Sequence, residues 1–302
     1  MNLHHLAVFN AVAEAGGINR ASQRLRISQP AVSRQIQILE EALGLTLLER
    51  QPRGVRLTEA GQILADYARR IFAIASQGEE VLADLRSLHT GKLRIGGSMS
   101  LGNYFLPEVI AAFHGDHPEI EIVLEVGNTE SVIDAIRHGR VDIGFIEGKC
   151  DNGDYDVERF MYDELIVIAS PDHPLAGLGP MPFHRLCQHS CVMRESGSGT
   201  REAMDALLER AGVGEHSFNL TLGSPEAVKR AVQRGAGLAV ASNLTVVNEL
   251  DNGTLVRIPL RGPPVHRELL RVTLPHKQLA PAAHPFLQRV EEYSERYGSN
   301  PQ

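Results

Sequence analysis

Apolar residues in the first 45 positions recur every three or four residues, and two polar turns interrupt them. A first amphipathic helix is predicted from about Leu3. The side-chain oxygen of Asn19 can cap a second helix that starts at about Arg20. Ser28 can cap a third helix, and Pro30 fits in its first turn because the missing amide would have no partner there. The apolar stripe of this third helix is Val32, Ile36 and Leu39.

Residues 49–57 alternate around a Pro/Gly turn and predict a small β-hairpin wing. No proline occurs from Thr58 to about Leu88, so a long helix capped by Thr58 is predicted. Its apolar seam has two series of residues seven apart: Leu64, Ile71, Gly78 and Leu85, and Tyr67, Ile74, Val81 and Leu88. A helix of roughly 30 residues is ~45 Å long, too long to bury this seam against a small domain. A partner helix from a second subunit is the expected cover, and the alternative is packing against the C-terminal domains.

Beyond residue 91 the pattern changes to alternating strands and helices. Strands are predicted at 92–97, 119–126 and 141–145, with helices at 106–114 and 131–138, and this βαβαβ order predicts a parallel sheet. A second set has strands at 165–169, 190–194, 218–222 and 237–241 and helices at 200–211 and 225–235. A strand at 266–274 and a helix near 285–297 follow. Two similar α/β halves imply a cleft between them.

The predicted organisation is therefore a winged helix-turn-helix over residues 1–61, a linker and dimerisation helix over 58–90, and a two-lobed α/β domain over 92–302. The chain is expected to cross between the lobes near Met161 and to return near Val265. The first lobe then holds residues 92–161 and 266–302, and the second holds 162–265.

The N-terminal layout of two helices, a wing and a long helix is that of a module that lays a helix in the DNA major groove. Glutamine can bond base edges bidentately, Ser and Arg can hold phosphates, and Pro30 offers apolar contact near a thymine methyl. Arg53, at the tip of the wing, can enter a minor groove or hold a phosphate. The predicted DNA contacts are Arg20, Ser28, Gln29, Pro30, Ser33, Arg34, Gln37, Arg50 and Arg53. The alternative is an ordinary solvated helix face.

Composition and charge change this picture in two ways. The hydrophobic content of 43%, with no apolar run near the ~20 residues of a membrane span and no signal peptide after Met1, predicts a soluble cytoplasmic protein without a membrane partner. The net charge is −7, but residues 1–60 hold seven Arg against five Glu, or +2, which leaves −9 for the other 242 residues. A module of charge +2 binds phosphates weakly, so useful affinity should require dimers or larger assemblies.

The predicted strand ends of the C-terminal half are rich in hydroxyl groups. Ligands of open α/β sheets bind outside the carboxyl ends of strands, where helix amino termini present free amides. These positions suit a small anion held without much charge, and Arg194 or Arg201 can add a charge-assisted bond. The alternative for each single serine is simple helix capping. The predicted effector-binding residues are Ser98, Met99, Ser100, Asn128, Thr129, Arg194, Ser196, Gly197, Ser198, Thr200 and Ser224.

The chain resembles the LysR-type transcriptional regulators through residues 29–33 (Gln-Pro-Ala-Val-Ser), Leu39-Glu40, Leu43-Gly44 and residues 57–61 (Leu-Thr-Glu-Ala-Gly). Leu48 departs from the phenylalanine that is frequent in the family, and residues 17–19 also differ. The resemblance covers nearly the whole chain. It implies an antiparallel linker-helix homodimer, a homotetramer, contact with RNA polymerase, and a periplasmic-binding-protein-like effector domain.

Residues 127–129 (Gly-Asn-Thr) and 197–201 (Gly-Ser-Gly-Thr-Arg) are similar to the branch that regulates carbon fixation and sulfur assimilation. This resemblance implies effector contacts at Ser98, Ser100, Thr129 and residues 196–200. Met99 replaces a hydroxyl residue that is frequent in that branch, so the ligand is expected to be partly apolar or different.

Other chemistry has little support in the sequence. His184, Cys187, His189 and Cys191 are dense but match no closed zinc site, so no metal and no cofactor is expected. A redox switch at Cys187 and Cys191 remains an alternative. No catalytic triad, Walker loop or dinucleotide fingerprint is present, which argues against an enzyme. A solute-binding protein that uses only the cleft is a further alternative.

Overall fold

The computed structural model describes residues 2–51, 54–86, 91–150, 154–210, 212, 220–275 and 277–297. The chain divides into two compact units, residues 1–86 and 87–302, which are described separately below. Among the described helices, none is both long and apolar enough to cross a membrane.

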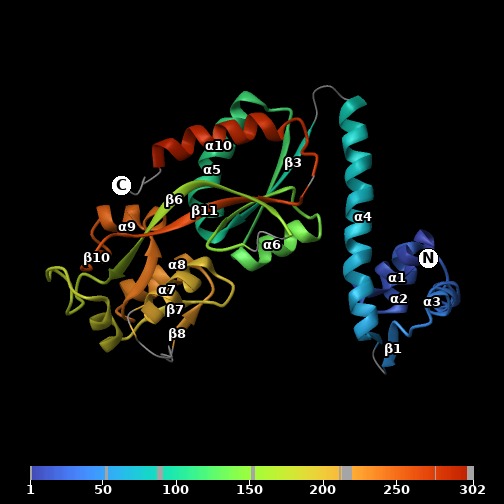
Figure 1. Ribbon diagram of the computed structural model, residues 1–302, viewed down its shortest axis with the longest axis horizontal. Helices are drawn as coiled ribbons and strands as arrows, with labels where there is room; N and C mark the ends of the chain where they lie inside the picture. Colours follow the sequence, from blue (N-terminus) through green and yellow to red (C-terminus); the bar gives the residue numbers. More distant parts are fainter. Residues whose placement is uncertain are drawn as a thin grey trace. The chain divides into compact units, whose positions relative to one another are not determined.

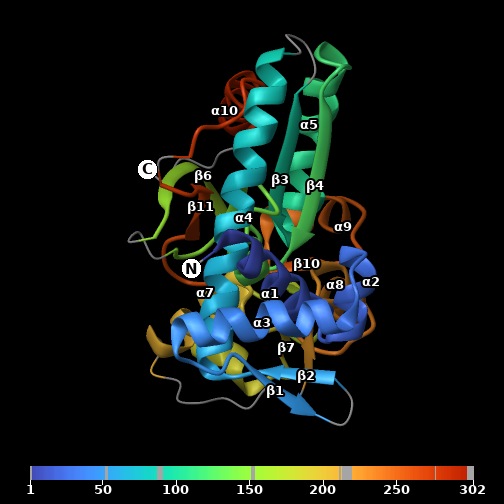
Figure 2. The ribbon, with the colours of Figure 1, turned by 90° about the vertical axis from the view of Figure 1, so that its right-hand side faces the viewer.

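The first unit has three short helices, a hairpin and a long helix (Figure 1). These elements are α1 (Leu3–Ala15), α2 (Ile18–Leu25), α3 (Gln29–Leu43), β1 (Leu48–Gln51), β2 (Gly54–Leu57) and α4 (Glu59–Arg86). Figure 2 shows the antiparallel hairpin of β1 and β2 beside the helices. Apolar side chains of α1, α2, α3 and α4 share one core, in which Leu6, Phe9, Val32 and Leu39 are fully buried. The expected helix, turn and wing succession of a winged helix-turn-helix is present.

Two of the three predicted caps in this unit are confirmed. Ser28 accepts a hydrogen bond from the amide of Ala31 at the start of α3, and Thr58 accepts one from the amide of Gly61 at the start of α4. The prediction for α2 was wrong. This helix starts at Ile18 after Gly17, which makes no side-chain cap, so Asn19 lies inside the first turn. The second helix is thus two residues longer at its start than its polar sequence indicated.

The apolar seam of α4 is divided between two environments. Leu64 and Ile71, predicted for the dimer seam, pack against the core of their own unit together with the buried Ala65 and Ala68. Three other large apolar side chains are exposed by more than half: Ile63 (55%), Tyr67 (58%) and Ile74 (64%). Their spacings of four and seven place them on one stripe of the helix. The side chains of Val81 and Leu85, and Leu88 itself, lie outside the described residues.

The second unit contains the α/β elements. Its strands are β3 (Lys92–Ser98), β4 (Glu121–Gly127), β5 (Ile143–Glu147), β6 (Asp156–Ala169), β7 (Val192–Arg194), β8 (Leu220–Leu222), β9 (Ala239–Ser242), β10 (Val256–Ile258) and β11 (Val265–Thr273). Its α-helices are α5 (Leu106–Asp116), α6 (Thr129–Arg137), α7 (Gly199–Arg210), α8 (Pro225–Gln233), α9 (Val247–Asp251) and α10 (Ala283–Tyr297). Shorter helical turns are η1 (Leu101–Phe105), η2 (Phe183–Gln188) and η3 (Asn243–Thr245).

Seven of the described strands form one sheet in the order β10-β6-β11-β5-β3-β4, with β9 also paired to β6, while β7 and β8 form a separate parallel pair. The predicted parallel pairing of the βαβαβ segment is confirmed, because β3 runs parallel to both β4 and β5. The long antiparallel pair β6 and β11 runs from one half of the unit into the other (Figure 1). We call the half with β3, β4, β5, α5, α6 and α10 the first lobe, and the half with β7–β10, α7 and α8 the second lobe.

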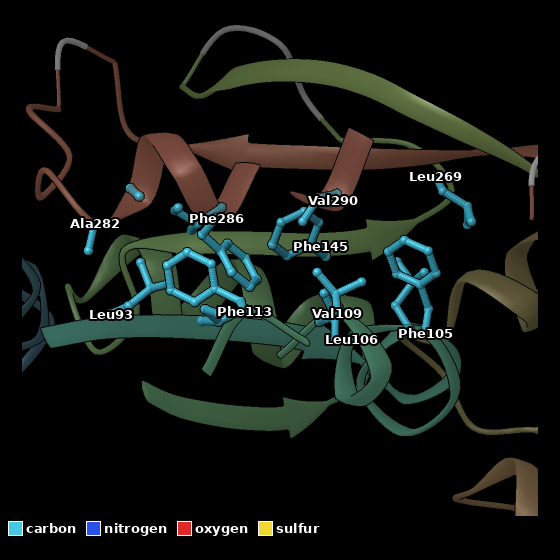
Figure 3. Close-up of a cluster of buried hydrophobic side chains, with 14 of the residues drawn as sticks. Leu93, Phe105, Leu106, Val109, Phe113, Phe145, Leu269, Ala282, Phe286 and Val290 are labelled. Carbon is cyan, nitrogen blue, oxygen red and sulfur yellow. The ribbon is translucent and has the colours of Figure 1, made fainter. Parts of the chain in front are cut away.

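The first lobe has helices on both faces of its sheet. Phe113 on α5, Phe145 on β5 and Phe286 on α10 interlock in one buried cluster, with Phe113 and Phe286 in edge-to-face contact at 5.4 Å between ring centroids (Figure 3). On the other face, Val132 and Ile136 of α6 pack against Val141, Ile146 and neighbouring residues. These packed layers hold the strand ends in fixed positions.

Sequence patterns predicted most strands and helices of this unit, but not the first part of β6 or the short elements that link the longer ones. Only residues 165–169 of β6 were predicted as strand, because the nine residues before them mix charged and apolar side chains without a regular alternation. These residues nevertheless pair along β11 from Asp156 to Leu165. The short elements β10, α9 and η1–η3 were also not predicted.

Candidate functional site

The first candidate site is the exposed face of α3 in the first unit. Ser28, Gln29, Pro30, Arg34 and Gln37 are exposed, while Ser33 is half-buried. The opposite stripe of the helix is buried in the core, so this face is held in a fixed orientation. The chemistry expected for groove recognition is therefore presented to solvent.

Three side chains on this unit are held by neighbours. The amide nitrogen of Gln29 donates to the side-chain oxygen of Asn19 at 3.0 Å, which joins α2 to the start of α3. Gln37 donates to Glu41 at 3.1 Å. Arg20 donates to the carbonyl oxygen of Gly16 at 3.2 Å. Asn19 was expected only as a cap, and its place beside Gln29 makes it an additional candidate for DNA contact.

The wing is described only in part. Arg50 pairs with Val55 in the backbone of the hairpin, but its side chain lies outside the described residues. Arg53, the predicted tip residue, also lies outside them.

The second candidate site lies where the carboxyl ends of the first-lobe strands face the second lobe. Ser98 ends β3, and Ser100 precedes η1; both are buried. Asn128 caps α6 by accepting from the amide of Ser131 at 2.9 Å. Thr129 donates to the carbonyl oxygen of Glu147 at 3.1 Å, which ties the start of α6 to the end of β5. Met99 is half-buried.

The loop before α7 brings the predicted second-lobe residues to this edge. The backbone amide of Glu130 donates to the carbonyl oxygen of Gly197 at 3.2 Å, and the amide group of Asn128 donates to the carbonyl oxygen of Ser196 at 3.4 Å. Ser198 and Thr200 are buried. Ser224 caps α8 by accepting from the amide of Ala227 at 3.2 Å. The amino termini of α6, α7 and α8 thus gather hydroxyl groups from both lobes.

A buried arginine on β11 links these hydroxyl groups. The Nη1 atom of Arg267 donates to the hydroxyl of Thr200 at 3.0 Å, and Nη2 lies 3.5 Å from the hydroxyl of Ser100. Arg267 also pairs with Asp163 at 2.7 Å, and Ser242 donates to the same carboxylate at 2.9 Å. Burial raises the pKa of Asp163, and the Arg267 guanidinium opposes this shift. The expectation of a site with little charge was therefore wrong: the hydroxyl groups surround a buried ion pair.

Lys229 on α8 makes a second connection between the lobes. Its ammonium group donates to the phenolic oxygen of Tyr104 in η1 at 2.6 Å and to the carbonyl oxygen of Thr245 at 2.7 Å, and it pairs with Glu249 at 2.9 Å. Tyr104 in turn donates to Glu226. Burial and this bond to Glu226 raise the pKa of Tyr104, so the phenol stays protonated.

Seven of the predicted effector residues line two cavities, whereas Ser98, Met99, Asn128 and Ser224 line neither. The smaller one, of about 10 Å³, has room for about one water molecule; Ser100, Arg194, Thr200 and Lys229 are among the residues that line it. The larger one, of about 570 Å³, is lined by Thr129, Ser196, Gly197 and Ser198 together with charged side chains of both signs. Its cations are Arg137, Lys149 and Arg201, and its acids are Glu130, Asp154, Glu202 and Asp205.

The two arginines expected to hold an anion already have partners. Arg194 is buried and bonds both carboxylate oxygens of Glu195 at 2.8 Å. Arg201 bonds Asp205 at 2.9 Å and the carbonyl oxygen of Arg194 at 3.3 Å. Neither guanidinium is therefore poised for a ligand without rearrangement.

Cys187 and Cys191 lie in surroundings that disfavour a reactive thiolate. Cys187 and Cys191 are half-buried in the apolar core of the second lobe. Burial raises the pKa of both thiols, that of Cys191 to about 11. Within the described residues no group of His, Cys, Asp or Glu side chains has the arrangement of a metal site.

Four residues of the inter-lobe site were not predicted from the sequence: Tyr104, Asp163, Lys229 and Arg267. Arg267 and Asp163 each stand among polar neighbours in the sequence, and no local motif indicates that they are buried. They face each other only because β6 and β11 pair with Asp163 opposite Arg267.

Comparison with known proteins identifies the family of both units. Residues 3–62 match the bacterial regulatory helix-turn-helix model of the lysR family, and residues 86–295 match the LysR substrate binding domain. The chain is 40% identical over 291 residues to a RuBisCO operon transcriptional regulator of Allochromatium vinosum, covering 96% of this chain and 95% of that protein.

Two solved structures are similar to parts or all of the chain. The regulatory domain of CcmR from Synechocystis PCC6803, in complex with 2-PG, is 31% identical with a TM-score of 0.64; the match covers 69% of this chain and all of that one. Full-length CbnR complexed with its target DNA is 23% identical with a TM-score of 0.67; the match covers 98% of this chain and 99% of that one. The second likeness supports the fold.

These matches decide two of the alternatives, an enzyme and a solute-binding protein. The family is one of transcriptional regulators and not of enzymes, and a protein that uses only the cleft would lack the matched helix-turn-helix. The RuBisCO operon relative agrees with the expected likeness to the carbon-fixation branch. The chain belongs to the LysR family of transcriptional regulators, with an N-terminal helix-turn-helix and a C-terminal effector-binding domain.

Proposed function

We propose that this regulator changes how it binds operator DNA when a small anionic metabolite binds between the two lobes of its effector unit. The observation that carries this proposal is the position of Arg267, whose guanidinium lies within 3.5 Å of hydroxyl groups from both lobes, those of Ser100 and Thr200. Free amides at the starts of α7 and α8 favour an anionic group at the same place.

The effector contacts are assigned to Ser98, Met99, Ser100, Asn128, Thr129, Arg194, Ser196, Gly197, Ser198, Thr200 and Ser224, with Arg267 and Lys229 added. In this assignment the first lobe comprises residues 92–161 and 266–302, and the second 162–265. CcmR, the 31% identical relative, is in complex with 2-PG, a small anion. This supports a small phosphorylated or carboxylated acid as the ligand class here.

DNA recognition is assigned to α3, with Ser28, Gln29, Pro30, Ser33, Arg34 and Gln37, to Arg20 and Asn19 on α2, and to Arg50 and Arg53 on the wing. The exposed stripe Ile63, Tyr67 and Ile74 on α4 supports a homodimer through this helix, because exposed apolar side chains in line favour a helix partner. A homotetramer that acts on RNA polymerase in the cytoplasm completes the proposal. Lobe closure would then change the angle between paired DNA-binding units and the bend of the DNA.

Capture of sheared genomic DNA on the purified full-length protein tests the DNA half of this proposal. Sharp enrichment beside one or a few operons is expected after a wash in moderate salt, and the neighbouring genes nominate effectors. Uniform recovery of the genome would contradict operator recognition. Repeating the capture with 2-phosphoglycolate and 3-phosphoglycerate shows whether an acid moves the peaks.

The effector half is tested with Thr129→Ala, which removes the hydroxyl that ties α6 to Glu147. The variant is expected to lose the response of DNA binding to the acid and to keep basal DNA binding. Thr221→Ala, at an exposed position of β8, is the matched control and should respond normally. A full response from Thr129→Ala would remove this residue from the site.

A further inference from the structure

Glu147 lies at the interface between the lobes. It ends β5, beside the end of β3 at Ser98, and only 4% of the residue is exposed. From the second lobe, Gly199 packs directly against it: a Cβ atom at Gly199 would lie 2.5 Å from the carbonyl oxygen of Glu147 and 3.0 Å from its Cβ. The backbone of Glu147 is further fixed by the hydroxyl of Thr129. The carboxylate is therefore held among the proposed effector contacts.

The Glu147 carboxylate lies farther from the Arg267 guanidinium than the Asp163 carboxylate does. Asp163 takes the short contacts of Arg267, at 2.8 Å to Nε and 2.7 Å to Nη2. The Oε1 atom of Glu147 lies 3.8 Å from Nη2, beyond hydrogen-bond distance. Two buried carboxylates thus lie near one guanidinium, and only that of Asp163 accepts its hydrogen bonds among the described residues.

Two buried oxygen atoms at this edge have no hydrogen-bond partner among the described residues. They are Oε1 of Glu147 and the hydroxyl oxygen of Ser98, both at the ends of adjacent parallel strands. A buried carboxylate oxygen that accepts no hydrogen bond is costly, because it has left water without compensation. A ligand that supplies a donor here removes this cost.

The charge of Glu147 limits which ligand groups can do so. An ionised phosphate or carboxylate group has no proton to donate and is repelled by a second carboxylate. A hydroxyl group has a proton to donate to Glu147. An acid without a hydroxyl leaves Oε1 of Glu147 without a hydrogen bond.

We propose that the effector of this protein is a hydroxy acid, whose hydroxyl donates to the Glu147 carboxylate while its acidic group lies at the amino termini of α7 and α8. Glu147 is then the residue that selects hydroxy acids over acids of equal charge without the hydroxyl. This inference rests on the proposed anionic effector, and it narrows the ligand class of the same site.

The test compares matched pairs of acids on the full-length protein by isothermal titration calorimetry. The pairs are 3-phosphoglycerate with 3-phosphooxypropionate, and malate with succinate; each differs by one hydroxyl at equal charge. In at least one pair the hydroxylated member is expected to bind about tenfold tighter or more, the size of a hydrogen bond to a charged group. In Glu147→Gln the ratio is expected to fall about threefold or more, because the neutral amide oxygen still accepts from the hydroxyl but without the charge that strengthens this bond. Glu268→Gln, an exposed carboxylate on β11, should keep the wild-type ratio.

The outcomes separate this inference from the function it rests on. Equal binding of both members of every pair, or a hydroxyl preference that Glu147→Gln retains, overturns the role of Glu147 while an anionic effector stands. Binding of none of the four acids counts against both. The wild-type comparison decides the question alone if the variant does not fold, which circular dichroism establishes.

Discussion

Lys229 and Tyr104 connect the two lobes through a hydrogen bond of 2.6 Å from the ammonium group to the phenolic oxygen. The ammonium nitrogen also lies 4.8 Å from the centroid of the Tyr104 ring. Tyr104 donates onward to Glu226, so the phenol bridges a cation and an anion of α8. One first-lobe side chain is therefore built into the polar interior of the second lobe.

Tyr104→Phe is expected to destabilise the protein, because Lys229 and Glu226 each lose a partner inside the structure. The expected loss is about 1–3 kcal/mol of the free energy of unfolding, the cost of leaving a buried polar group unpaired. Urea denaturation followed by circular dichroism measures it. Tyr162→Phe is the control, because the Tyr162 hydroxyl accepts from the exposed Arg159. A Tyr104→Phe protein as stable as this control would show that the bridge carries no net stability.

Asn128 is expected to act in two separable ways, as the cap of α6 and as a donor to the second lobe. Asn128→Ala removes both and should lower the free energy of unfolding by about 1 kcal/mol. Asn128→Asp keeps the acceptor for the amide of Ser131 but cannot donate to the carbonyl oxygen of Ser196. It should retain most of the stability yet weaken the inter-lobe contact, which effector titration of the full-length protein detects. If both variants lose equal stability, the cap is not the main role.

Ile74→Glu is expected to separate dimers, because a charge would be buried in the proposed helix seam. Sedimentation velocity should show a smaller species, and the affinity for a two-half-site operator should fall at least tenfold. Ser76 is exposed on the opposite side of α4 from Ile63, Tyr67 and Ile74, so Ser76→Glu is the matched control. An unchanged assembly in Ile74→Glu would place the dimer contact elsewhere.

Arg34→Ala is expected to weaken DNA binding without changing the oligomer. If Arg34 holds a phosphate, the slope of log K against log salt should decrease by about one, with affinity falling on all sequences. Fluorescence anisotropy on the captured operator across a salt series gives this slope. Arg257→Ala, on β10 in the effector unit and paired with Glu164, serves as the control. A loss confined to one base position would instead assign Arg34 to base recognition.

Cys191 is expected to react slowly with alkylating reagents in the folded protein. Burial raises the pKa of its thiol to about 11, so the thiolate is scarce at pH 8 and rises only as the pH approaches that value. In the unfolded chain this thiol ionises near the ordinary pKa of about 8.5. Ionisation therefore favours the unfolded state at alkaline pH, and the free energy of unfolding falls there. Iodoacetamide labelling followed by mass spectrometry, with the urea-unfolded protein as reference, measures the difference. Equal rates in both states would restore the redox-switch alternative.

The N-terminal unit could be predicted closely because its signals are local. The cap at Ser28, the proline in the following turn and the stripe of Val32, Ile36 and Leu39 are all read within a few residues. The prediction for Asn19 failed because Ile18 joins the apolar core, and this packing extends α2 past the residue that looked like its cap. Tertiary burial decided the start of that helix.

The strand ends of the effector unit were also predictable, because each alternates with a helix at short range. The charged centre was not. Arg267 and Asp163 are 104 positions apart and meet only through the pairing of β11 with β6. Tyr104 and Lys229 are 125 positions apart and meet across the lobes.

The sequence by itself determined the order of the elements, the helix caps and the hydroxyl groups at the strand ends, because these depend on neighbours along the chain. Only the tertiary structure decided which side of α4 remains exposed, since that depends on which face the first unit covers. It also decided that Oε1 of Glu147 is buried near Arg267 without a hydrogen-bond donor from the part of the chain that the structure describes. The partners of a buried charge are set by strand register and lobe packing, which local patterns do not encode.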